Sequence, residues 1–212
     1  MGKYNKGILG SFSGKVGTVI GASWKGIDYM RSLAKPGSRT ASNDQIIQRA
    51  KFALASTFLK PVSALLTIGF KNDASKQTPY NVATSLFLKN SITGVYPDLE
   101  VDYGNVLISR GPLSIPAGVQ LSSPESGKLQ LTWADNSAAG IAAGTDKALV
   151  MIFNPEQRKY QTETNGGTRG SGGQVLDVPA FMGAVAHVWL AFISQDGKTL
   201  STSVYAGTVT IN

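Results

Sequence analysis

Few side chains in this sequence are of the types that carry out covalent or metal chemistry. The 212 residues contain one histidine, His187, and no cysteine, which excludes a thiolate zinc site, a cysteine nucleophile and a site built from several histidines. A lone histidine in an apolar stretch, with no nucleophile motif around it, is more often structural than catalytic. We therefore expect no catalytic residue, no metal site and no cofactor, and we predict that the protein is not an enzyme.

Two patterns resemble known ligand sites but lack the required spacing. Asp98, Glu100 and Asp102 fall at alternate positions of an expected strand and could ligate calcium, but they do not have the spacing of a calcium loop. We interpret them as a solvated acidic edge. The pair Gly14-Lys15 suggests a phosphate-binding loop, but that motif needs Ser or Thr at the next position, where Val16 stands.

The positive charge is concentrated in the first third of the chain. The whole sequence carries 20 Lys and Arg against 13 Asp and Glu, whereas residues 1–71 alone carry 11 basic and two acidic side chains. Such a segment could neutralise phosphates, meet an acidic protein or simply be solvated. Aromatic residues do not alternate with these cations at strand spacing, so the sequence favours a solvated surface. The candidate phosphate- or partner-binding cations are Lys3, Lys6, Lys15, Lys25, Arg31 and Lys35.

Two further residues are candidates for partner contacts. The three tryptophans, Trp24, Trp133 and Trp189, are expected to be core or interface anchors, and Trp24, which precedes a turn, is the one expected to be partly exposed. Arg169 stands in the middle of the glycine-rich segment 165–173, which we expect to be a flexible loop. Arg169 could therefore touch a partner or an anion, and the alternative is a plain mobile loop.

The elements expected before Pro97 are a hairpin and helices. Residues 16–33 predict a β-hairpin that turns at Lys25-Gly26. A capping pattern at Ser42 predicts a helix over 43–60, followed by a short helix over 62–68. A third helix is expected to begin at Thr78-Pro79 and to end near Gly94.

After Pro97 the apolar pattern changes to a period of two, which is typical of strands. The fold class is therefore α+β: an N-terminal β-hairpin plus helices, followed by a C-terminal antiparallel β-sandwich of the immunoglobulin or fibronectin III-like type. We expect a basic hairpin and helical domain over 1–111 and the β-sandwich over 112–212. The strands are expected at 99–103, 106–109, 118–122, 128–133, 147–153, 159–163, 174–178, 186–194 and 199–211.

Residues 7–21, with the motif Gly-Ser-Phe-Ser-Gly-Lys-Val-Gly at their centre, are followed by Trp24-Lys25-Gly26. Together they resemble an uncharacterised bacterial family of about this length, a domain of unknown function. The resemblance implies a shared fold over the whole chain and supplies no activity. We also expect the family to occur in phages or other mobile elements. Further stretches that resemble it are 50–54, 68–71, 90–97, 196–198 and 203–205.

The leading hypothesis is a non-enzymatic structural or assembly protein, a virion or mobile-element component that binds other proteins in an oligomeric assembly through its basic N-terminal domain. The alternative is a nucleic-acid-binding protein that uses the same segment. A further alternative is a carbohydrate or protein recognition module carried by loops such as 165–173. We expect no membrane span and no signal peptide, and hence a cytoplasmic or virion-associated protein.

Overall fold

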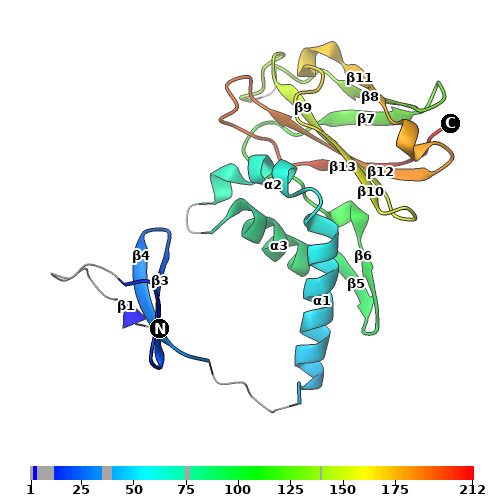
Figure 1. Cartoon of the computed structure of the whole chain (residues 1–212). Coiled ribbons are helices and arrows are strands. Elements are labelled where there is room, and N and C mark those ends of the chain that lie inside the picture. The colour runs from blue at the N-terminus through cyan, green and yellow to red at the C-terminus, as the bar shows by residue number, and fades with distance from the viewer. Residues whose placement is uncertain (1, 4–11, 35–39, 75–76, 139) are drawn as a thin grey trace. The chain divides into compact units, whose positions relative to one another are not determined.

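The computed structural model describes residues 2–3, 12–34, 40–74, 77–138 and 140–212. The chain forms two compact units, Met1–Ser42 and Asn43–Asn212, called here the N-terminal and C-terminal units. Figure 1 labels their elements. The boundary expected at 111–112 falls inside the C-terminal unit, where helices and strands share a core.

The N-terminal unit is a four-stranded antiparallel sheet with the strand order β1-β4-β3-β2. The hairpin of β3 and β4 confirms the expected turn at Lys25-Gly26, where both residues have positive φ angles of 49° and 77°. Such angles are typical of the mirror-image two-residue turns that match the twist of a hairpin. The strands are β1 (Gly2–Lys3), β2 (Gly14–Val16), β3 (Val19–Trp24) and β4 (Ile27–Ser32).

The helices of the C-terminal unit begin where the sequence predicts them. They are α1 (Asn43–Leu59), α2 (Ser63–Gly69) and α3 (Pro79–Asn90). The hydroxyl of Thr78 caps α3 by accepting a hydrogen bond from the backbone N–H of Asn81 at 3.2 Å. Among the described residues, no single helix has both the length and the apolar character to cross a membrane, and α1 and α2 meet that requirement only together, as a pair bent by 89°.

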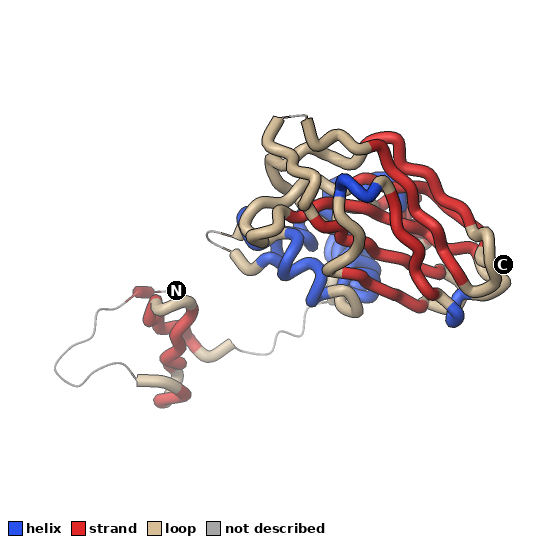
Figure 2. The backbone as a smooth tube through the Cα atoms, turned by 90° about the horizontal axis from the view of Figure 1, so that it is seen from above, coloured by secondary structure: helices blue, strands red, loops and turns tan. Residues whose placement is uncertain are grey.

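Antiparallel strands, red in Figure 2, form most of the other regular structure of the C-terminal unit. One sheet has the order β10-β9-β12-β13, a second has the order β11-β8-β7, and β5 and β6 form a separate hairpin. The strands are β5 (Ile92–Val95), β6 (Asp98–Val101), β7 (Ala117–Ser122), β8 (Lys128–Ala134), β9 (Lys147–Asn154), β10 (Lys159–Glu163), β11 (Gly173–Asp177), β12 (Val185–Ile193) and β13 (Val204–Thr210). Single 3-10 turns lie at Lys71–Asp73, Tyr103–Asn105, Arg169–Ser171 and Pro179–Phe181.

Strands β9 and β12 are buried on both faces, because one face packs against the helices and the other packs against the second sheet. Leu149 and Met151 of β9 belong to a buried cluster with side chains of all three helices. Their neighbours Val150 and Ile152 belong to a second cluster with side chains of β8. The sheet β10-β9-β12-β13 therefore lies between the helices and the three-stranded sheet β11-β8-β7 (Figure 1). This shared packing explains why the helical segment does not separate from the strands at residue 111.

The strand expected at 106–109 is an irregular segment. It is held mainly through side chains: the N–H of Ile108 donates to the hydroxyl of Ser203 at 3.0 Å, and the hydroxyl of Ser109 donates to the carbonyl of Ser201 at 2.8 Å. In contrast, β5 was not expected. It follows α3 directly and pairs with β6 through the register that places Val95 opposite Asp98.

Candidate functional site

The strand register brings three of the four described candidate cations onto one face of the N-terminal sheet. Lys15 pairs with Ile20, which pairs with Arg31, and Lys3 pairs with Tyr29. Because paired residues share a face and side chains alternate along each strand, one face can be followed across all four strands. We call it the basic face, and its residues are Lys3, Lys15, Ile20, Ala22, Trp24, Ile27, Tyr29 and Arg31.

The opposite face of the same sheet carries a different set of side chains. Asp28, the one carboxylate in residues 1–42, pairs with Ser23 on that side and so points away from the basic face. Phe12 also packs there, against Gly21. A Cβ at Gly21 would lie 2.4 Å from the carbonyl oxygen of Phe12, so this position requires glycine. The basic face is thus free of carboxylates.

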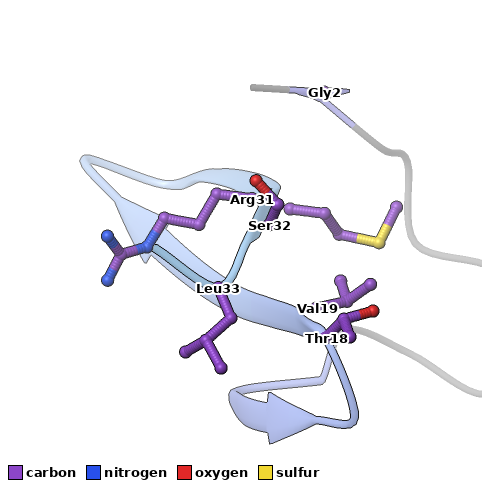
Figure 3. Close-up of a pocket in the computed structure, with 7 residues that line it drawn as sticks. Gly2, Thr18, Val19, Arg31, Ser32 and Leu33 are labelled. Carbon is purple, nitrogen blue, oxygen red and sulfur yellow. The ribbon is translucent and has the colours of Figure 1, made fainter. Parts of the chain in front are cut away.

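Figure 3 shows one hollow of the N-terminal unit, a wide one of about 670 Å³ around Thr18, Val19, Ser32 and Leu33. The Arg31 side chain extends away from Val19 in this view, as the alternation of the strand requires. Apolar side chains, including Met30, provide most of the lining. The lining also includes the side chains of Thr18, Arg31 and Ser32.

On the basic face, a hollow of about 290 Å³ is lined by Lys3, Trp24, Ile27 and Tyr29. Trp24 is 49% exposed and Ile27 is 45% exposed, so their apolar surfaces remain available for contact. The ammonium of Lys25 lies 5.3 Å from the centroid of the Trp24 ring, within the range of a cation–π contact. The hollow therefore combines two aromatic rings with nearby cations.

The partial exposure of Trp24 agrees with the sequence analysis, whereas the arrangement of aromatic residues does not. Trp24 and Tyr29 share a face with Lys3, Lys15 and Arg31, and Tyr29 and Arg31 occupy alternate positions of β4. The two-residue turn was the signal that could have shown this, because it fixes which residues pair. Lys6 and Lys35 lie outside the described residues, so the structure places neither of them.

Arg169 lies in the interior and not in a flexible loop. Its side chain is fully buried, its Nε is 3.0 Å from Oδ2 of Asp146, and one terminal nitrogen donates to the carbonyl of Ser114 at 2.9 Å. The other terminal nitrogen donates to Oδ1 of Asn136, and the guanidinium carbon lies 3.9 Å from the centroid of the Phe192 ring. Arg169 is therefore engaged within the protein, which corrects its expected role as a partner contact.

The loop around Arg169 is anchored as well. The indole N–H of Trp133 donates to the carbonyl of Arg169 at 2.9 Å, and the N–H of Gly170 donates to the carbonyl of Gly144 at 2.9 Å. The partner Asp146 is 23 residues from Arg169, so a local pattern in the sequence cannot reveal the pair.

His187 belongs to an aromatic cluster. Its Nδ1 is 2.7 Å from the hydroxyl of Tyr205, and its ring centroid lies 4.0 Å from that of Tyr103. Burial lowers the pKa of His187, while burial raises the pKa of the nearby Tyr160 to about 12. Within the described part of the chain, no group of three His, Cys, Asp or Glu side chains could hold a metal ion.

Comparisons with known proteins give a family and a weak similarity to solved structures. A family model described as a family of unknown function (DUF6266) matches residues 11–207. No curated protein matches the chain. Among solved structures, the fn3 domain of the human collagen alpha-1(XX) chain is 15% identical, with a TM-score of 0.35, and the match covers 46% of this chain and 84% of that one. Because the family model spans most of the sequence, the chain belongs to the family of unknown function DUF6266.

Proposed function

We propose that the protein is a non-enzymatic structural or assembly component, cytoplasmic or virion-associated, that binds other proteins through its N-terminal unit. One observation carries the proposal: among the described residues of that unit, Gly21 alone is buried. A single sheet layer with no buried side chain lacks a core of its own. Such a sheet gains stability when a partner covers one of its faces.

The face opposite the basic face fits a protein partner. Val19 and Leu33 line the hollow of Figure 3 and are exposed. Val16, which pairs with Val19, is 65% exposed. Exposed apolar side chains that lie together mark interaction surfaces. A second copy of this chain is the proposed partner, in an oligomeric assembly such as a virion or mobile-element particle.

Light scattering at micromolar concentration tests the assembly. We expect the full chain to exceed the monomer mass and the double variant Val16→Ser/Val19→Ser to shift toward the monomer. The matched control is Ile141→Ser, because Ile141 is an exposed apolar residue of the C-terminal unit. A monomer at every concentration, with no partner recovered by pull-down, would contradict the proposal.

We also propose that the two facing sheets of the C-terminal unit form a fibronectin III or immunoglobulin-like sandwich, with the helices added on one side. Support comes from the apolar cluster between the sheets, in which the rings of Trp133 and Phe192 lie 5.6 Å apart at an angle of 81°. Nuclear Overhauser contacts between these two rings test the packing, and their absence would contradict it.

The second candidate function is nucleic-acid binding through the basic segment. The observation that favours it is the basic face, whose charged side chains are all cations. The expected signature is an affinity for DNA or RNA that falls with salt. The recognition module expected on loop 165–173 loses its main support, because Arg169 is buried.

A further inference from the structure

We propose that the basic face binds single-stranded nucleic acid, with unpaired bases stacked on Trp24 and Tyr29 and with phosphates on Lys3, Lys15 and Arg31. This inference rests on the second candidate function and names its ligand. It concerns the face of the sheet opposite the apolar surface assigned to a protein partner.

The aromatic rings are placed where neighbouring bases could contact them. Tyr29 pairs with Ala22, and Trp24 stands two residues beyond Ala22 on the same face. Trp24 and Tyr29 are thus diagonal neighbours, whose Cα atoms lie about 7–8 Å apart in an antiparallel pair. Both line the same hollow of about 290 Å³. Aromatic platforms of this kind stack bases of any sequence.

The cations surround this aromatic centre. Lys15 and Arg31 flank Ile20 at one end of the sheet, Lys3 lies beside Tyr29, and Lys25 lies at the turn. Asp28 points to the other face. A strand laid across the rings would therefore meet positive side chains on each side, and its phosphates would meet no carboxylate of this sheet.

The exposed ring of Trp24, with the half-buried ring of Tyr29 beside it, favours a single strand over a duplex and over an acidic protein. In a duplex, the faces of the bases are stacked on one another and cannot contact Trp24 or Tyr29. An acidic protein would use the cations and has no specific need for an exposed tryptophan ring. Dependence on unpaired bases is the property that separates the three ligands.

The experiment measures fluorescence anisotropy of a labelled oligothymidylate of about 15 nucleotides, a length within the range that single-strand binding folds cover. The full chain is used at low salt. Binding should also quench tryptophan fluorescence, and this signal reports on Trp24 because Trp133 and Trp189 are buried. With three phosphate contacts, the logarithm of the affinity should fall with the logarithm of salt with a slope of about −2.

Variants separate stacking from charge. Trp24→Ala should weaken binding by about 5- to 100-fold, and Trp24→Phe should restore most of it, since phenylalanine keeps an aromatic ring. Lys15→Gln and Arg31→Gln should each reduce the salt slope. Lys159→Gln, at an exposed cation of the C-terminal unit, is the matched control and should change neither the affinity nor the slope.

An abasic oligomer of the same length separates this inference from the function on which it rests. We expect it to bind at least several-fold more weakly and to leave Trp24 fluorescence unchanged. Equal binding of the abasic oligomer, of a duplex or of polyglutamate would overturn base stacking. Equal binding of the abasic oligomer would still leave phosphate binding intact, whereas no binding of any oligonucleotide at low salt would overturn both.

Discussion

Arg169 and Asp146 form a buried ion pair, and each of them also makes a hydrogen bond to the surrounding backbone. Oδ2 of Asp146 accepts hydrogen bonds from the Arg169 side chain and from the N–H of Ala143 at 2.9 Å. Removal of one partner from such a pair leaves an uncompensated charge in the interior, which costs much more than the loss of a surface ion pair. The pair therefore fixes the loop 165–173 to the body of the C-terminal unit.

We predict that Arg169→Ala lowers the free energy of unfolding by about 3–5 kcal/mol. Urea denaturation of both proteins measures the difference. Lys159→Ala serves as the control, and a change within about 0.5 kcal/mol is expected there because Lys159 is exposed. An Arg169→Ala protein as stable as the parent would show that the pair contributes nothing.

His187 gives the stability of the protein a pH dependence. Burial lowers the pKa of His187 below its ordinary value of about 6.5, so the unfolded chain binds this proton at a higher pH than the folded protein does. The free energy of unfolding should therefore fall as the pH decreases from 7 toward 5. His187→Gln should lessen this fall, and denaturation at several pH values compares the two proteins. Parallel pH profiles would rule out the contribution of His187.

At the scale of elements, Gly69 is a helix residue at which alanine is expected to be less favourable than glycine, because the backbone of Ile108 lies close to it. It is the last residue of α2, and its carbonyl accepts a hydrogen bond from the N–H of Arg110 at 3.1 Å. A Cβ at this position would lie 2.0 Å from the carbonyl oxygen of Ile108. The helix end and the segment after residue 105 thus pack backbone against backbone.

Gly69→Ala should destabilise the protein by about 1–3 kcal/mol, although alanine favours a helix by about 1 kcal/mol over glycine. Thermal or urea unfolding measures the change. Thr67→Ala in the same helix is the control, and its effect should stay small because Thr67 is exposed. A stabilised Gly69→Ala protein would mean that the contact with Ile108 relaxes freely.

The sequence predicted the elements whose signals are local. The capping residues before α1 and α3 placed both helices within a few residues, and the period of two placed most strands of the C-terminal unit. It failed at residues 106–109, which are hydrogen-bonded to the hydroxyl of Ser203 and the carbonyl of Ser201, more than 90 residues away. It also missed the shared face of Trp24 and Tyr29, which depends on pairing between strands. The contacts of residues 106–109 depend on partners distant in the chain, whereas the shared face of Trp24 and Tyr29 follows from the two-residue turn between their strands.

For the whole molecule, the two units differ in how they are stabilised. All buried apolar side chains of the described core lie at Ala55 or later in the chain. The buried apolar core that the structure describes thus belongs to the C-terminal unit. This division places stability in one unit and, by our proposals, binding in the other.

Deletion of residues 1–42 should leave the C-terminal unit folded, with a midpoint of thermal unfolding within about 2 °C of that of the full chain. Differential scanning calorimetry measures it. The same deletion should abolish self-association and oligonucleotide binding. A decrease of the midpoint by more than about 8 °C, or retained binding, would contradict this division.

The β5–β6 hairpin gives the protein a place for chemical attachment. Val95 is 81% exposed at its tip, and the sequence contains no cysteine. A Val95→Cys variant would therefore carry one reactive thiol at an exposed position. A dye, a spin label or a crosslinker could then be coupled at one defined point, without a background of natural thiols and without repacking the interior.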